Sequence, residues 1–149
     1  MKTTLAAVLC FSVLAGCDAQ DGETVGPRGG IVMSDDGRLA LDVPAGALDE
    51  EVAIRIEVVD DAPRGTVGTV YAIEPAGLAL LFPAELTYDL ATDESDRSLD
   101  LTDVQMDDLL LITEKNARWQ PLADRSVDVD AQTLSASVLF LSSYAIVSR

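Results

Sequence analysis

The strongest constraint on the fold of this chain is an apolar strand that ends in a proline–glycine turn. Leu39, Leu41 and Val43 stand at every second position, so their side chains share one face of a strand. Pro44 fixes φ and Gly46 can adopt positive φ, so the chain turns sharply after Val43. The pattern predicts a β-strand with one buried face, on which the following strands pack.

The same alternation recurs along the chain and is clearest over residues 51–59. There it predicts an inward face of Val52, Ile54, Ile56 and Val58 and an outward face of Glu51, Arg55 and Glu57. Asp-Gly at 36–37 predicts a hairpin, and a second Pro-x-Gly turn follows at 75–77. Leu78, Leu80 and Phe82 are predicted to face one way, with Pro83 breaking that strand or placing it at an edge.

Further strands are predicted at 109–113, 118–120, 127–129, 133–138 and 144–147. The 109–113 strand lacks alternation and should be covered on both faces. Trp119, the only tryptophan, is assigned to packing, with a binding groove as the alternative. No useful helical period follows residue 16. These patterns predict an all-β fold, an antiparallel β-sandwich.

The N-terminal residues have the pattern of a targeting signal. One lysine precedes an apolar run at 5–15, which is too short to span a bilayer and is typical of a signal peptide. Leu14-Ala15-Gly16-Cys17 resembles the lipobox of bacterial lipoproteins, which implies cleavage between Gly16 and Cys17. The resemblance also implies a diacylglyceryl group, with acyl chains such as palmitate, on the Cys17 thiol. The alternative is an ordinary secretory signal with an incidental cysteine.

The expected organisation is a signal peptide at 1–16, a lipidated cysteine and flexible tether at 17–26, and one sandwich domain at 27–149. That domain contains an acidic loop at 91–108, with a weakly indicated short helix at 101–106, and C-terminal strands at 109–149. A nine-residue tether reaches about 15–18 Å on average. Asp18 resembles the inner-membrane retention signal of enterobacterial lipoproteins, but other bacteria differ, so inner versus outer membrane stays open.

Charge limits the partners. The formal charge is −16, and removal of residues 1–16 takes Lys2 and no acid, which leaves 133 residues at −17. A phosphate backbone would repel this surface, and the basic residues form no run, so nucleic acid is not an expected partner. The same net charge disfavours anionic lipid surfaces.

Three segments resemble the ZU-five domain, the β-domain of ankyrins, netrin receptors and tight-junction scaffolds, which has relatives among bacterial surface lipoproteins. They are Gly26–Gly30, Leu41–Leu48 and Glu74–Leu86, within residues 26–90. The tail, with Trp119 and Ser142–Val147, is similar to the end of those bacterial relatives. The resemblance implies a β-sandwich interaction module, and in some relatives self-cleavage before a serine of a His-Phe-Ser element.

The amino-acid composition argues against several kinds of catalytic and binding site. The chain has no histidine, and its two cysteines are Cys10, in the predicted signal peptide, and Cys17, so neither a disulfide nor a Ser-His-Asp or Cys-His site is expected. At the self-cleavage position the chain reads Phe140-Leu141-Ser142, which keeps the serine and lacks the base, so we expect no cleavage. No metal site is predicted; calcium is the alternative, with candidate ligands Asp35, Asp36, Asp93–Asp96, Asp128 and Asp130.

Three functions remain after these exclusions. The preferred one is a membrane-anchored, extracytoplasmic lipoprotein that acts as a non-catalytic protein-interaction or envelope-structural module. Its expected partners are the membrane and an unidentified protein, and no cofactor is expected. The alternatives are a calcium- or glycan-binding adhesion module and a small hydrolase with a carboxylate pair. Two buried carboxyl groups with raised pKa values in one cleft would indicate the hydrolase.

Overall fold

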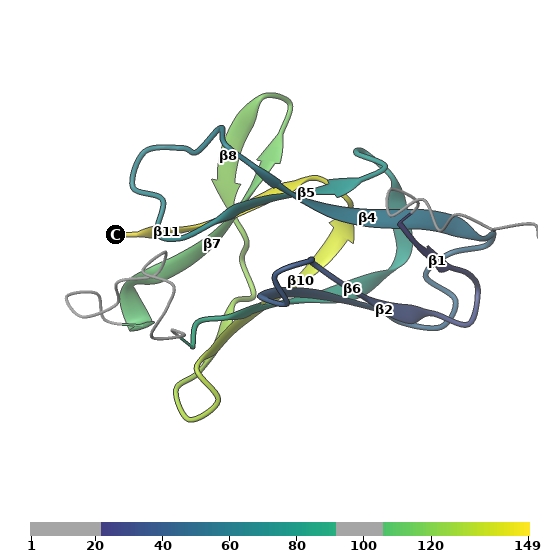
Figure 1. Cartoon of the computed structure of the whole chain (residues 1–149), viewed down its shortest axis with the longest axis horizontal. Helices are drawn as coiled ribbons and strands as arrows, with labels where there is room; N and C mark the ends of the chain where they lie inside the picture. Colours follow the sequence, from purple (N-terminus) through teal and green to yellow (C-terminus); the bar gives the residue numbers. More distant parts are fainter. Residues whose placement is uncertain (1–21, 92–105) are drawn as a thin grey trace, which may run out of the picture.

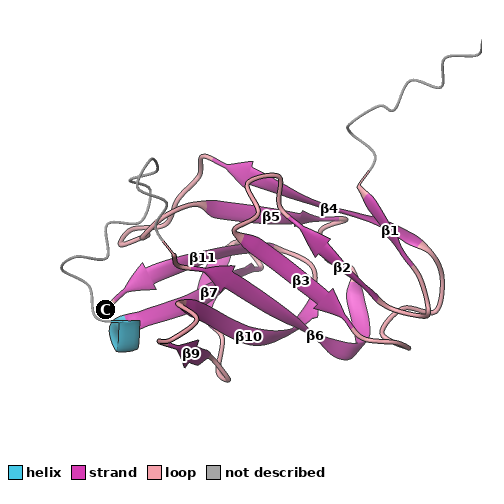
Figure 2. Ribbon diagram, turned by 60° about the horizontal axis from the view of Figure 1, so that its bottom comes forward, coloured by secondary structure: helices cyan, strands magenta, loops and turns pink. Residues whose placement is uncertain are grey.

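The protein is a sandwich of two antiparallel sheets, seen in a computed structural model that describes residues 22–91 and 106–149 (Figures 1 and 2). In this part of the chain one sheet has the strand order β1-β4-β5-β11-β7-β8 and the other β2-β3-β6-β10-β9. The predicted all-β sandwich is therefore confirmed. The strands are β1 Glu23–Val25, β2 Gly30–Met33, β3 Leu39–Val43, β4 Val52–Val59, β5 Val70–Glu74, β6 Ala79–Asp89, β7 Leu109–Lys115, β8 Arg118–Pro121, β9 Ser126–Asp128, β10 Thr133–Phe140 and β11 Ser143–Ser148.

The turns follow the predicted chemistry. Gly37, in the β2–β3 hairpin, has φ of 70°, and Gly46, in the turn after β3, has φ of 84°. Asn116 and Ala117 join β7 to β8 with φ of 53° and 58°. Positive φ at both central positions matches the right-handed twist of the paired strands. Local sequence therefore sets the hairpins.

The inward faces of the two sheets form one core. Leu39, Leu41 and Val43 are buried in it together, as their spacing predicts. The strand β7 also contributes Ile112 to a second, smaller cluster with Val70 and Ala145, against which the half-buried Trp119 packs. Because β7 has apolar partners on both faces, its lack of alternation is explained, and the assignment of Trp119 to packing is confirmed.

In β4 the alternation prediction is correct at the centre and wrong at the end. Ile54 is fully buried and Ile56 is 6% exposed, but Val58 is 59% exposed. Strand β1 pairs with β4 only along Val52–Ile54, so Val58 lies beyond that pairing near the end of its strand. The periodicity gives the side on which Val58 lies, while the neighbouring strands decide whether it is covered.

In β6 the prediction about Pro83 is wrong, because the strand continues through it to Asp89. Ala84 pairs with Val138 and Ala79 with Phe140, so four residues of β6 lie opposite the single residue Leu139. This bulge interrupts the ladder where Pro83 lacks an N–H donor. The irregularity also turns Phe82 outward, where it is 56% exposed, although the sequence predicted it to lie with Leu80.

The predicted tether is too long at its C-terminal side. Glu23–Val25 forms β1 on the edge of β4, and Val25 is buried in the core. An apolar side chain and a free strand edge thus draw these residues into the domain. Residues 1–21, with the predicted signal peptide, Gly16, Cys17 and Asp18, lie outside the described residues. So does most of the acidic loop, 92–105, with Asp93–Asp96, while Met106–Asp108 forms a 3-10 turn, η1.

The described residues contain no helix of the length and apolar character needed to cross a bilayer.

Substitutions in β4 test this burial pattern. We expect Ile54→Ala to lower the free energy of unfolding by about 2–5 kcal/mol, because it leaves a cavity in the core. Val58→Ala, on the same face but exposed, should change it by about 0.5 kcal/mol or less. Denaturant titration measures both. An equal loss for the two variants would contradict the described register.

Candidate functional site

The three tyrosines of the chain each bridge the two sheets. Tyr71, on β5, donates its hydroxyl hydrogen to Oδ2 of Asp36 in the β2–β3 hairpin, at 2.5 Å. Tyr88, on β6, donates to the carbonyl of Tyr144 on β11, at 3.1 Å, and Tyr144 donates to the carbonyl of Phe140 on β10. The rings of Tyr71 and Tyr88 also meet edge to face, with centroids 5.5 Å apart. All three side chains are buried, and their polar ends are satisfied by the opposite sheet.

Asp36, a candidate metal ligand in the sequence, is the polar centre of the β2–β3 hairpin. Its Oδ1 accepts from the Ser34 hydroxyl at 2.5 Å and from the Arg38 backbone N–H at 3.1 Å. Ser34 Oγ in turn accepts the Leu39 N–H at 2.9 Å. With Tyr71 on Oδ2, both carboxylate oxygens have protein donors. The hairpin conformation and the inter-sheet contact explain this aspartate without a bound ion.

The pKa values reflect the same contacts. Burial alone would raise the pKa of Asp36, but the hydrogen bonds from Ser34, Tyr71 and the Arg38 backbone, with the charge of Arg38, hold it below its usual range. Burial, reinforced by the Asp36 carboxylate, raises the pKa of Tyr71, and burial raises that of Tyr144 to about 12. A catalytic acid needs a raised carboxyl pKa, so the shift of Asp36 has the opposite sign.

The other candidate ligands do not join Asp36 in a cation site. Asp35 and Asp130 are exposed on their turns. Asp128 uses Oδ1 to accept the Ala131 N–H at 2.9 Å, which closes the β9–β10 turn. Across residues 22–91 and 106–149 no three Asp, Glu, Cys or His side chains are arranged to hold a metal ion. The four aspartates belong to two separate hairpins. Both carboxylate oxygens of Asp36 and Oδ1 of Asp128 already accept hydrogen bonds from protein groups.

Ser142 also has a structural partner. Its hydroxyl donates to the carbonyl of Glu114 at 2.6 Å, which links the β10–β11 corner to β7. Phe140, at the position of the missing base, is half-buried, and Lys115 Nζ lies 5.2 Å from its ring centroid. The hydroxyl is thus oriented by a carbonyl acceptor, and the neighbouring ring serves a cation–π contact.

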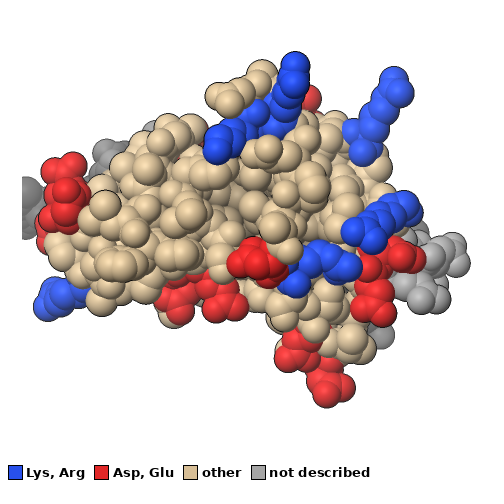
Figure 3. All heavy atoms as spheres, turned by 180° about the vertical axis from the view of Figure 1, so that it is seen from behind, with Lys and Arg blue, Asp and Glu red and all other residues tan. Residues whose placement is uncertain are grey.

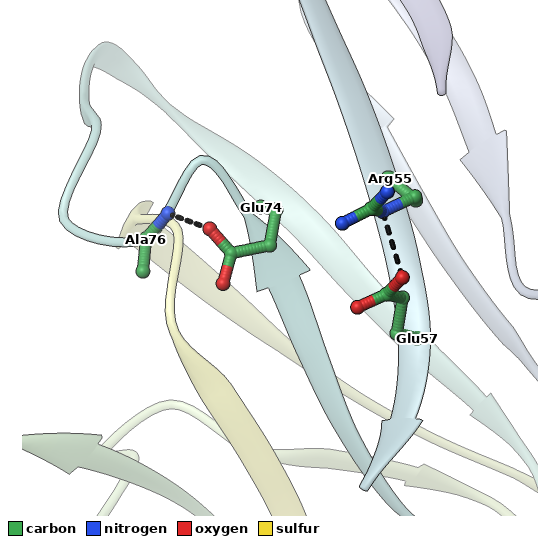
Figure 4. A network of polar contacts seen from close by, with 4 residues as sticks. All are labelled: Arg55, Glu57, Glu74 and Ala76. Atoms are coloured by element: carbon green, nitrogen blue, oxygen red, sulfur yellow. Dashed lines mark hydrogen bonds and ion pairs between the residues drawn. The ribbon is translucent and has the colours of Figure 1, made fainter. Parts of the chain in front are cut away.

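A charged cluster lies on the outward face of β4 and β5 (Figure 4). Arg55 Nε lies 2.9 Å from Oε1 of Glu57, and the two side chains are 41% and 48% exposed. Glu74, paired with Arg55 in the ladder, accepts the Ala76 N–H at 2.7 Å and so supports the β5–β6 turn. Exposed ion pairs of this kind contribute little to stability.

The sequence did not predict the apolar cluster formed at the β6 bulge by Leu81, Phe82 and Leu139. These side chains are 65%, 56% and 53% exposed. Phe82 packs over the Pro44–Gly46 turn, where a Cβ on Gly46 would lie 3.2 Å from its ring. Figure 3 shows one face of the molecule, on which an uncharged area is bordered below by acidic side chains and above and to the right by basic ones. A long β6 with a proline at its middle was the only available signal of the bulge.

Neither protein-family models nor curated proteins give a match to this chain.

The Asp36 contacts predict an acid-sensitive stabilisation. A carboxyl group whose folded pKa is lowered contributes stability above its unfolded pKa, about 3.9, and loses it as pH falls through the folded pKa. We expect Asp36→Asn to lower the free energy of unfolding by about 1 kcal/mol at pH 7. The difference from wild type should shrink below about pH 4. Denaturant titrations across this range measure it; a gap that widens on acidification would contradict the assignment.

The bonded Ser142 predicts that the chain is not self-processed. Mass spectrometry of the purified protein should find no fragment that begins at Ser142, because the hydroxyl has no histidine to accept its proton. Ser142→Ala provides the control, and its C-terminal region should have the same integrity as that of wild type. A wild-type fragment that disappears in Ser142→Ala would show that another group serves as the base.

Proposed function

We propose that this protein is a bacterial envelope lipoprotein, anchored by acyl chains on Cys17 and exposed outside the cytoplasm. Its β-sandwich acts as a non-catalytic interaction or structural module of ZU-five type. The observation that carries the anchoring is the lipobox Leu14–Cys17 behind a short apolar run with a charged start.

The position of the domain relative to the lipobox supports this assignment. Described structure begins at Gly22, five residues after Cys17, and β1 follows at once. Five residues span at most about 17 Å when fully extended. A domain attached in this way operates close to its membrane, which suits a module that binds or organises other envelope components.

The polar side chains described above favour a module without chemistry of its own. The Asp36 carboxylate and the hydroxyls of Ser34, Tyr71 and Ser142 all hold turns or join the two sheets. Among the exposed large apolar side chains of the described residues, Leu81, Phe82 and Leu139 lie together at the β6 bulge and offer a surface for a protein partner. The protein partner that we propose remains to be identified by pull-down from detergent-solubilised envelopes.

The two cysteines allow a matched test of the anchor. Cells expressing the protein are given an alkyne analogue of palmitate, and the incorporated label is measured on the purified protein. Wild type and Cys10→Ser should be labelled and should float with membranes, because Cys10 lies in the segment that is removed. Cys17→Ser should carry no label, since the acceptor thiol is gone. Label on Cys17→Ser, or none on wild type, would contradict the proposal.

A further inference from the structure

We infer that β2 is a docking edge, at which a basic, extended segment of a protein partner pairs as an additional strand of the β2-β3-β6-β10-β9 sheet. This inference rests on the proposed function in one respect, because it gives the non-catalytic interaction module a class of partner. It does not depend on the lipid anchor. Three features of β2 support it, namely the direction of its backbone groups, its composition and the charges beside it.

The backbone of β2 has hydrogen-bonding groups that point away from its neighbour β3. In an antiparallel ladder every second residue pair exchanges hydrogen bonds, and the pairs between them direct their N–H and C=O groups outward. The Ser34 N–H donates to the Leu39 carbonyl at 2.9 Å, which fixes this alternation. Val32 therefore bonds to β3, while Ile31 and Met33 direct their backbone groups to the other side. In the described part of the chain β2 ends its sheet, so these groups lie along an open edge (Figure 2).

β2 also lacks the features that protect the other edge strands. Exposed edges in natural proteins are commonly blocked by charged side chains, by proline or by very short strands. Among the strands that end the two described sheets, β1 and β9 have three residues each and contain Glu23 and Asp128. The strand β8 contains Arg118 and Pro121. β2, with the sequence Gly-Ile-Val-Met, has neither a charge nor a proline. Of these four strands, β2 is therefore best suited to accept another strand.

The two residues that direct backbone groups to this edge also carry exposed apolar side chains. Ile31 is 54% and Met33 is 56% exposed, while Val32 between them is buried in the core. Strand alternation places Ile31 and Met33 on the outer face of the sheet. An added strand would set its own side chains beside these two. Main-chain hydrogen bonds would then hold the segment, and side-chain contacts would select it.

Acidic side chains lie beside this edge on the same face of the sheet. Ile31 is opposite Asp42 in the β2–β3 ladder, and Asp42 is opposite Glu85 in the β3–β6 ladder. Both acids are exposed, and like charges directly opposite each other destabilise a sheet. A lysine or arginine next to Ile31 on an added strand would cover that side chain with its stem. Its charge would approach Asp42, which lies two strand spacings, or about 10 Å, from the added backbone. The edge therefore fits a segment in which basic and apolar residues alternate.

A second copy of the chain fits this edge less well. Two β2 strands paired antiparallel about Val32 would use the same backbone groups, with Ile31 beside Met33 of the other copy. Each copy would, however, bring the same exposed acids and a formal charge of −16, and neither β2 nor β3 contains a basic residue. Charge thus favours a basic partner. The salt dependence separates the two cases, because salt weakens attraction between opposite charges and relieves repulsion between like charges.

Synthetic peptides test this pairing on the purified full chain in detergent micelles. The probe is a fluorescent peptide in which lysine and valine alternate over about six residues, the length of an ordinary strand. One control peptide carries glutamate in place of lysine. A second control peptide keeps lysine but has N-methyl groups on alternate amides, which remove the hydrogen-bond donors of one strand edge. Fluorescence anisotropy at low salt measures each Kd.

Three variants of the protein separate the edge from the charge. Ile31→Pro, the edge variant, removes one outward N–H and leaves the hydrogen bonds to β3 in place, since proline is tolerated at strand edges. Asp42→Asn with Glu85→Gln, the acid variant, removes the two acids beside the edge. Asp107→Asn with Asp108→Asn is the matched control, because it removes the same charge from exposed residues of η1. Near-ultraviolet circular dichroism checks that each variant keeps its native packing.

We expect the lysine peptide to bind the wild type, and added salt to weaken that binding. The edge variant and the acid variant should each raise the Kd of the lysine peptide by tenfold or more. The glutamate peptide and the N-methylated peptide should bind the wild type more weakly by a similar factor. The matched control should change the Kd by less than twofold.

Absence of binding by the lysine peptide, or equal binding of the N-methylated peptide, would overturn the inference. An equal loss in the acid variant and in the matched control would do the same, because net charge alone would then attract the peptide. So would a wild-type dimer, detected by chemical cross-linking, that salt strengthens and Ile31→Pro abolishes, since a second copy would then occupy the edge. Mass spectrometry of Cys17 distinguishes the proposals. An acylated protein that fails the peptide test overturns this inference alone, and an unacylated protein that passes it contradicts only the proposed anchor.

Discussion

The structure depends on three phenol hydroxyls that join one sheet to the other. Burial of the leucine, isoleucine and valine faces supplies most of the driving force for the sandwich, but the hydrophobic effect is non-directional and would tolerate small shifts between the sheets. A buried phenol has to find an acceptor in a limited range of geometry. Tyr71, Tyr88 and Tyr144 find theirs on Asp36, Tyr144 and Phe140, always across the sandwich. These three hydrogen bonds therefore specify the relative position of the two sheets. All three must form in the folded state, because a buried hydroxyl without an acceptor would be destabilising.

The strands and turns were predictable because they depend on neighbours in sequence. Alternation over 39–43 and the Asp-Gly and Pro-x-Gly turns determine local backbone conformation, and the structure confirms them. The exposure of Val58 and Phe82 was not predictable in this way. A strand period assigns a side chain to one face of a sheet, but coverage depends on where β1 stops along β4 and on a bulge set by the pairing of β6 with β10. Both are properties of strands distant in sequence.

The candidate site also combines features that depend on neighbours in sequence with features that depend on distant strands. The chemistry of aspartate makes Asp36 a candidate calcium ligand only as the alternative to a solvated acid. Both of its carboxylate oxygens accept hydrogen bonds from the protein, and the donor to Oδ2 is a tyrosine 35 residues away in the other sheet. Nothing near Asp36 in the sequence points to Tyr71. The three tyrosines occupy apolar positions of predicted strands, so their hydroxyl groups were an available signal. Each buried hydroxyl requires an acceptor, and this requirement favours a structural role for some of the carboxylates.

The concentration of aspartate at one end of the sandwich follows from the turns. At one end the strands are joined by segments containing Asp35-Asp36, Asp60-Asp61 and Asp128-x-Asp130, where aspartate can close a turn with its own side chain, as Asp128 does. At the other end, proline and glycine form the turns at 44–46 and 75–77, and the β6 bulge exposes apolar side chains. Local turn chemistry thus concentrates aspartate at one end of the sandwich. The other end also carries acids, at residues 49–51 and at Glu74, whose side chain supports the turn at 75–77.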